Sequence, residues 1–183
     1  MALIEPPAYK AAKLLLECLC AELAANQNED PTLEMPARCC LRAGAETLID
    51  IDNTGVDYCC LGEAYVKVLG VYPSSNFPEI DEFVAGSCQM KHFTAQLELG
   101  VLRCIADSPT CEESDFAVRR ALADAAAGYR AACCWGKALQ EPINGFRRGT
   151  KWFAGPWGAA GPEGLCVSGA MTLQVSLPGI SCC

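Results

Sequence analysis

Apolar and polar residues alternate most regularly over residues 93–104, FTAQLELGVLRC. Successive side chains of a β-strand point to opposite faces, so this alternation predicts a strand with one apolar and one polar face. The apolar set is Phe93, Ala95, Leu97, Leu99 and Val101, and the other set is Thr94, Gln96, Glu98 and Gly100. One-sided alternation is typical of antiparallel sheets, because parallel sheets are usually covered on both faces.

Other segments also predict strands. Residues 64–72 (AYVKVLGVY) are rich in β-branched and aromatic residues, and residues 167–177 alternate between apolar and polar side chains. We expect a further strand over residues 146–153 and a short one over residues 38–42. The glycine- and proline-containing stretch GPWGAAGPEGLC is predicted to be the connection between the last two strands.

Two segments have helical spacing. Apolar residues recur three and four positions apart over residues 8–25, which predicts a helix followed by a polar loop over residues 26–36. A second helix is expected to begin at Ser108-Pro109, because serine is a good N-cap, proline is tolerated in the first turn, and acidic residues follow. Its predicted buried stripe consists of Val118, Leu122, Ala125, Tyr129, Ala132 and Cys133, with Trp135-Gly136 near its end.

The predicted order is helix, three strands, helix, two strands, without an internal repeat. This order predicts an α+β fold, a mostly antiparallel sheet with two main helices. With 183 residues, 51% of them hydrophobic, the chain is expected to form one domain over residues 1–183, with a short N-terminal tail of about residues 1–7. No stretch approaches the roughly 20 apolar residues of a membrane span, and residues 1–7 lack the basic and apolar regions of a secretory signal.

The net charge of −8 argues against a nucleic-acid-binding protein of the basic-patch kind. Such proteins bind phosphates through Lys and Arg, and here 14 basic residues face 22 acidic ones. Arg147, Arg148 and Lys151 form one local basic cluster, interpreted as a solvated turn or a contact between subunits.

Residues for catalysis or metal binding are sparse. His92 is the only histidine, and the chain contains no G-x-S-x-G elbow, no G-x-G-x-x-G and no P-loop. Asp50, Asp52, Asn53 and Asp57 resemble part of a calcium loop, but position twelve is Leu61 instead of glutamate, so a turn is predicted. We therefore expect no enzymatic activity, no cofactor and no metal ion.

Fourteen cysteines are present, eight of them in four adjacent doublets at residues 39–40, 59–60, 133–134 and 182–183. Disulfide geometry disfavours a bond within a doublet, so each doublet is expected to direct one sulfur to each side of its element. Cys39, Cys40, Cys59 and Cys60 are candidate disulfide cysteines that would hold the irregular segment between them; the alternative is that they stay reduced. Cys133 is predicted to pack as a small hydrophobic residue. The absence of Cys-x-x-Cys spacing argues against a zinc site.

Several segments together resemble a known family. They are LLLECLCAEL, YVKVLGVYPSSNFP, LELGVLRC, PTCEESDFAVRRALADAAAGYRAACCW and GPEGLCVSGAMTLQVSLP. In combination they resemble a cysteine-rich family encoded in the structural-gene clusters of actinobacterial tailed phages, beside the neck and tail genes. The element order is also similar to that of tail terminator proteins of long-tailed phages, which form a hexameric ring that caps the tail tube and docks it to the head connector.

The resemblance implies a structural virion protein at the head–tail interface, assembled in the host cytoplasm as a ring, a hexamer by analogy. Its expected partners are further copies of itself, the tail tube protein and the connector or stopper protein. DNA would pass through the lumen without specific binding, along the polar sheet face of Thr94, Gln96, Thr172 and Gln174.

Trp152, Phe153 and Trp157 are the candidate interface residues, although the same loop is equally able to fold over its own domain. A head-to-tail adaptor or stopper and a minor tail protein are alternatives within the phage interpretation. A disulfide-stapled extracellular binding domain is the alternative from a different class.

Overall fold

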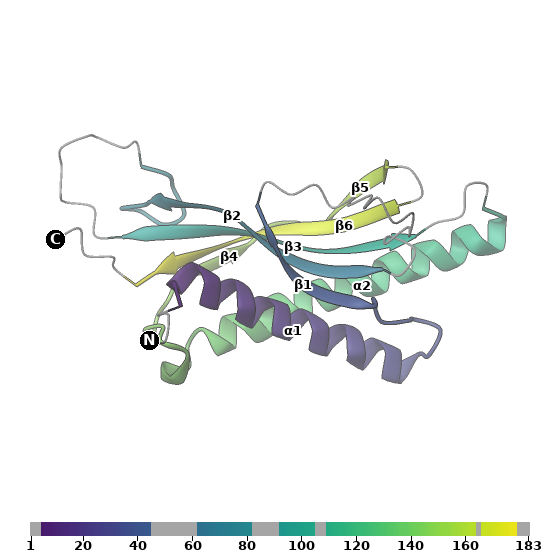
Figure 1. Cartoon of the computed structure of the whole chain (residues 1–183), viewed down its shortest axis with the longest axis horizontal. Coiled ribbons are helices and arrows are strands. Elements are labelled where there is room, and N and C mark those ends of the chain that lie inside the picture. Colours follow the sequence, from purple (N-terminus) through teal and green to yellow (C-terminus); the bar gives the residue numbers. More distant parts are fainter. Residues whose placement is uncertain (1–4, 45–61, 82–91, 105–108, 164–165, 179–183) are drawn as a thin grey trace.

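The computed structural model describes residues 5–44, 62–81, 92–104, 109–163 and 166–178. Within them a six-stranded sheet carries both long helices on one face, as Figure 1 shows. The elements are α1 (Pro7–Glu29), β1 (Arg38–Ala43), β2 (Glu63–Pro73), β3 (Phe93–Cys104), α2 (Cys111–Ala138), the 3₁₀ turn η2 (Pro142–Asn144), β4 (Trp152–Ala154), β5 (Gly158–Glu163) and β6 (Cys166–Leu177). The predicted α+β fold with two main helices is confirmed.

The strand order is β1-β2-β3-β6-β4, and β5 also pairs with β6. The β2–β3, β3–β6, β4–β6 and β5–β6 pairs are antiparallel, whereas β1 runs parallel to β2. Because β3 occupies one edge of β6, the short strands β4 and β5 share the other edge, with β4 at residues 173–175 and β5 over residues 166–170. The sheet is therefore mixed, but mostly antiparallel.

The core lies between the sheet and the helices. The predicted alternation of β3 is confirmed: Ala95, Leu97 and Leu99 are fully buried on the helix side. Their β6 partners in register are Val175, Leu173 and Met171, and helix α1 packs against the same face. Burying each large apolar side chain contributes roughly 1.5–3 kcal/mol, so this layer is the main stabilising contact of the fold.

Helix α1 continues through Glu29, so the prediction that residues 26–29 belong to a loop was wrong. Contacts with α2 explain the extra turn. The side-chain amide of Asn26 donates to the carbonyl of Ala123 at 3.1 Å, and Arg130 donates to both Asn26 and Glu22. These long-range hydrogen bonds stabilise a helical end that has little local tendency to form.

Helix α2 begins at Cys111 with Thr110 as its N-cap, not at Ser108-Pro109. The hydroxyl of Thr110 accepts from the backbone N–H of Glu113, and the Glu113 carboxylate accepts from the backbone N–H of Thr110 at 2.7 Å. This reciprocal capping box satisfies two N–H groups that the helix leaves unpaired. The bond from the backbone N–H of Thr110 holds the pKa of Glu113 below its ordinary value. The ionised carboxylate therefore stabilises the helix at neutral pH, and this stabilisation is lost as the pH falls through the lowered pKa.

We expect Thr110→Ala to lower the free energy of unfolding by about 1 kcal/mol, because the cap hydroxyl is removed. Urea denaturation of the variant and the wild type measures this difference. Thr110→Ser, which keeps the hydroxyl, serves as the control. An equal loss in the serine variant would show that the hydroxyl is not responsible.

The buried face of α2 differs from the predicted one. Of the predicted stripe, Val118, Leu122, Tyr129 and Cys133 are exposed, and Ala132 is buried. The face that packs inward consists of Asp124, Ala127, Gly128, Ala131, Ala132, Trp135 and Gly136. Small residues prevail because Trp157 lies directly against Gly128, and Trp152 against Gly136, where any Cβ atom would collide with the indole ring.

The segment after α2 also departs from prediction. Of the expected strand over residues 146–153, only Trp152 and Phe153 are in a strand. Gly145 and Gly149 have positive φ angles of 77° and 85°, and such left-handed residues interrupt an extended strand. Conversely, the connection predicted for GPWGAAGPEGLC contains β5, because its backbone pairs with the remaining edge of β6.

Candidate functional site

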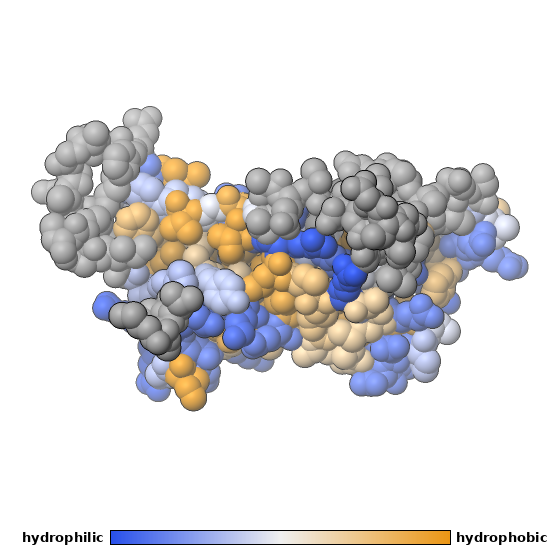
Figure 2. All heavy atoms as spheres, viewed as in Figure 1, coloured by the Kyte–Doolittle hydropathy of each residue, from blue (hydrophilic) through white to orange (hydrophobic). Residues whose placement is uncertain are grey.

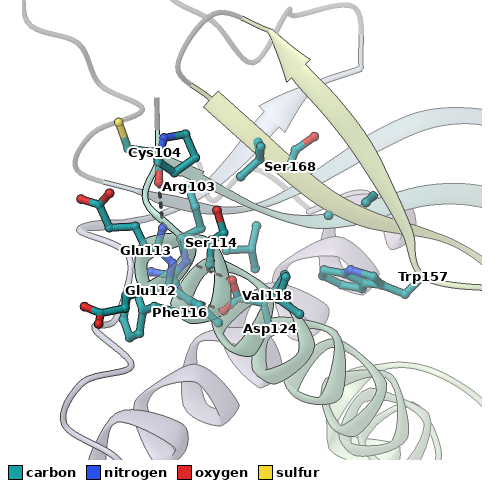
Figure 3. A pocket seen from close by; sticks show the side chains of 18 residues that line it. Arg103, Cys104, Glu112, Glu113, Ser114, Phe116, Val118, Asp124, Trp157 and Ser168 are labelled. Carbon is teal, nitrogen blue, oxygen red and sulfur yellow. Dashed lines mark hydrogen bonds and ion pairs between the residues drawn. The ribbon is translucent and has the colours of Figure 1, made fainter. Parts of the chain in front are cut away.

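A pocket of about 750 Å³ opens between the N-terminal half of α2, the end of β3, the start of β6 and β5. Figure 3 shows it from close by, with Trp157 reaching in from one side and Glu112 and Glu113 at the opposite rim. Its lining is mainly apolar and includes Val101, Phe116, Ala117, Val118, Ala121, Trp157, Ala159, Val167 and Gly169. A concave, apolar surface of this size is typical of a binding site.

The base of the pocket contains a buried ion pair. Arg103 on β3 donates to both carboxylate oxygens of Asp124 on α2, at 3.0 and 2.8 Å. A third bond from Arg103 reaches the carbonyl of Glu34 at 2.7 Å. Both side chains are almost completely enclosed, so each charge depends on the other as its partner. The ion pair thereby links β3 to α2.

Arg120 forms the side of the pocket next to this pair. Its guanidinium donates to the carbonyl of Cys104 at 2.7 Å and lies 5.5 Å from the ring centroid of Phe116. Burial lowers the pKa of Arg120, and the positive charge of Arg103 lowers it further. The Cys104 carbonyl and the Phe116 ring therefore fix the position of the Arg120 guanidinium in the wall of the pocket.

The three candidate interface residues lie in different environments. Trp152 and Trp157 are half-buried and pack on α2, with a T-shaped contact between Trp152 and Trp135 at a centroid distance of 6.0 Å. The backbone N–H of Trp157 donates to the hydroxyl of Tyr129 at 2.9 Å. Phe153 points outward and is 52% exposed. The structure thus uses the two tryptophans for internal packing and leaves Phe153 accessible.

The sheet face opposite the helices carries the polar residues expected to line a lumen. Thr94, Gln96, Thr172 and Gln174 lie on this face of β3 and β6, and Gln174 donates to the hydroxyl of Tyr72 at 2.7 Å. Two ion pairs join strands on the same face, Arg42 with Glu63 and Lys67 with Glu98. The hydroxyl of Thr94 is buried and has no hydrogen-bond partner in the described part of the chain.

Tyr65 is a large side chain of that face and is almost completely buried. Its ring lies on Gly100 of the neighbouring strand, where no Cβ atom would fit. Burial raises the pKa of Tyr65, and the nearby Glu98 carboxylate raises it further. The Lys67 ammonium lies 5.2 Å from the Tyr65 ring, so Tyr65, Lys67 and Glu98 form one contact group.

Two disulfides connect α1 to its neighbours. Cys18 is bonded to Cys134 of α2, with Cα atoms 6.0 Å apart, and Cys20 is bonded to Cys39 of β1, with Cα atoms 6.4 Å apart.

In each of the doublets at residues 39–40 and 133–134, one cysteine is disulfide-bonded and the other is not. Cys40 is half-buried and has no sulfur partner among the described cysteines, whereas Cys39 is disulfide-bonded. Cys133 is exposed instead of packed as a hydrophobic residue, because Cys134 is the member that faces α1. The other two candidate disulfide cysteines, Cys59 and Cys60, lie outside the described residues.

Catalytic and metal candidates remain few. His92 is exposed. The described residues contain no group of three or more His, Cys, Asp or Glu side chains placed to hold a metal ion. The acidic segment Asp50–Asp57 lies outside the described residues. In the described helices no stretch is long and apolar enough to cross a bilayer.

Comparison with protein-family models and with curated protein sequences gives no match. The site is therefore interpreted from its own geometry.

Sequence reasoning did not find the pocket. It forms where β3 and α2 meet β5 and β6, two pairs of elements that lie apart along the chain, and no local motif marks it. One signal was present: Gly128 and Gly136 are eight positions apart, a spacing that keeps two residues on one helical stripe. Glycine at both positions indicates that another part of the protein packs closely against this face of α2. The face with the larger apolar side chains is then the one turned outward.

Proposed function

We propose that this protein is a structural subunit that works by self-association, the tail terminator at the head–tail joint of a tailed phage. The exposed apolar face of α2, together with the pocket beside it, is the observation that carries the proposal. Val118 is 58% exposed, Leu122 66% and Tyr129 47%. Their spacing places these exposed apolar side chains on one face of the helix, and apolar residues gathered at the surface mark protein–protein contacts.

The fold supports the same proposal. Both helices cover one face of the sheet, and in the described residues no helix covers the other face, as Figure 1 shows. On that second face Arg42 pairs with Glu63 and Lys67 with Glu98, and Gln96, Thr172 and Gln174 are uncharged. A ring that turned this face inward would present DNA with few free charges to bind, as unhindered passage requires.

In the proposed assembly one face of the ring contacts the last tail tube subunits and the other contacts the head connector or stopper. The resemblance of the sequence segments to a phage neck and tail family supports these partners. A head-to-tail adaptor or stopper and a minor tail protein use the same self-association and are alternatives within the proposal.

Light scattering on a sizing column, followed by electron microscopy of the peak, tests the proposal on the full chain. We expect a single oligomer that electron microscopy resolves as a ring with a central opening. A protein that remains monomeric at the highest concentration reachable would overturn the proposal.

The two disulfides favour a second candidate function, a disulfide-stapled extracellular binding domain. They join α1 to α2 and to β1, and so cross-link the helical layer to the sheet. This candidate predicts a monomer whose cysteines are oxidised, whereas the ring subunit predicts an oligomer. The mass of the sizing-column peak distinguishes the two, and thiol titration of a monomer peak tests whether its cysteines are oxidised.

The cross-link itself yields a stability prediction. Replacing Cys18 and Cys134 with serine is expected to lower the free energy of unfolding by about 2–4 kcal/mol, because the bond closes a long loop of the unfolded chain. Chemical denaturation without reductant measures the loss. Cys133→Ser is the matched control, since this neighbouring cysteine is exposed and should change stability by only about 0.5 kcal/mol or less. Equal losses in both variants would contradict a specific role for the disulfide.

A further inference from the structure

We propose that the turn containing η2 of one copy inserts Ile143 into the pocket of the next copy, so that copies associate head to tail. This inference rests on the proposed self-association and assigns the two surfaces that make it. Its two parts lie apart along α2: the turn follows the C-terminal end of this helix, and the pocket is lined by its N-terminal half.

The turn presents a rigid apolar tip. Ile143 is 92% exposed, the highest value of any large hydrophobic residue in the described part of the chain. Figure 2 shows hydrophobic atoms protruding among hydrophilic ones at the lower left, where the end of α2 continues into this turn. The side chain of Asn144 donates to the carbonyl of Ala138 at 2.8 Å, and Gln140 bonds to both Gly149 and Thr150. A turn fixed in this way loses little conformational entropy when it binds.

The charges around the two parts are complementary. Arg147, Arg148 and Lys151 are exposed beside the turn, where Glu141 is the neighbouring acid. At the pocket, Glu112 and Glu113 stand on the rim, and Asp115 follows them. Opposite charge at the edges of an apolar contact steers association and fixes its orientation.

The size and position of the pocket fit a second copy. A volume of about 750 Å³ is ample for the Ile143 side chain and the proline next to it. Asp124 is the lining residue of α2 nearest its C-terminal end, and 14 residues (138 − 124) separate it from Ala138, where the helix ends. At 1.5 Å per residue, about 21 Å of helix therefore lies between the pocket and the turn, so a chain cannot fill its own pocket with its own turn. Each copy therefore contributes one turn and one pocket, a head-to-tail arrangement that forms a ring when the rotation between successive copies closes.

Two variants test the contact in the full chain. Ile143→Asp removes the apolar tip but keeps the pocket, whereas Val118→Lys blocks the pocket and repels the basic turn but keeps the tip. Both positions are exposed, so neither change should affect folding. We expect each variant alone to associate at least about tenfold more weakly than wild type. An equimolar mixture should form a one-to-one dimer, because one intact tip meets one intact pocket and the chain of contacts stops there.

Light scattering on a sizing column gives the mass of each sample. Ile80→Asp and Val71→Lys are the matched controls, the same substitutions at exposed positions outside the turn and the pocket, and they should associate like wild type. If both test variants form the wild-type oligomer, the assigned contact is wrong while the ring proposal stands. If they are monomeric but their mixture forms no dimer, the turn and the pocket do not contact each other. A monomeric wild type would overturn both proposals.

A charge pair provides a second test that is independent of the apolar contact. Arg148→Glu and Glu112→Lys alter exposed side chains on the two parts, and each should weaken association severalfold. Combining both changes in one chain should restore it, since the charges are again opposite across the contact. A combined variant that is weaker than either single variant would contradict the proposed pairing.

Discussion

Replacing Trp135 with alanine is expected to lower the free energy of unfolding by about 3–5 kcal/mol. Trp135 is fully buried near the C-terminal end of α2. Its indole N–H donates to the carbonyl of Ala11 on α1 at 2.9 Å, and its ring makes an edge contact with Trp152 of β4. One side chain therefore joins both helices and the sheet edge, and its removal leaves a cavity that these rigid elements cannot close.

Urea denaturation of Trp135→Ala, Trp135→Phe and wild type measures this effect. The phenylalanine variant keeps most of the volume and loses the hydrogen bond to Ala11, so a smaller loss of about 1–2 kcal/mol is expected. Phe153→Ala is the control, because this exposed aromatic residue fills no space in the core. A loss below about 1 kcal/mol for Trp135→Ala would show that α2 does not depend on this anchor.

Removing the Asp124 carboxylate is expected to have an effect of similar size. Asp124→Leu leaves the guanidinium of Arg103 enclosed without a counter-charge, which costs about 3–5 kcal/mol. The double variant Arg103→Met/Asp124→Leu removes both charges and should recover most of that loss, because an apolar pair needs no desolvation of charge. The carbonyl of Glu34 then loses its bond from Arg103, so complete recovery is not expected.

Denaturation of the two single variants and the double variant gives the coupling energy of the pair. Arg130→Met, at an ion pair that is partly exposed to solvent, is the control and should cost about 1 kcal/mol or less. If the two single losses simply add in the double variant, Arg103 and Asp124 do not interact energetically, and the ion pair is not what links β3 to α2.

The strands were the part of the fold most readily predicted from sequence. The bounds of β3 were predicted to the residue, and those of β2 and β6 within one residue at each end. Alternation with a period of two is a local property, and an antiparallel sheet with one buried face imposes it directly. No alternation marks the turn η2 or the strand β5. The turn depends on glycines that follow it, and β5 forms because an edge of β6 is left free, which is a property of the assembled sheet.

The sequence by itself determined the class of fold and the order of the elements apart from β5. Only the tertiary structure decided which face of α2 is buried. The apolar pattern favoured Val118, Leu122 and Tyr129, but Trp152 and Trp157 occupy volume that only a glycine and alanine face can accommodate. That packing constraint turned the larger apolar side chains outward and created the pocket, and it arises between segments that are far apart along the chain.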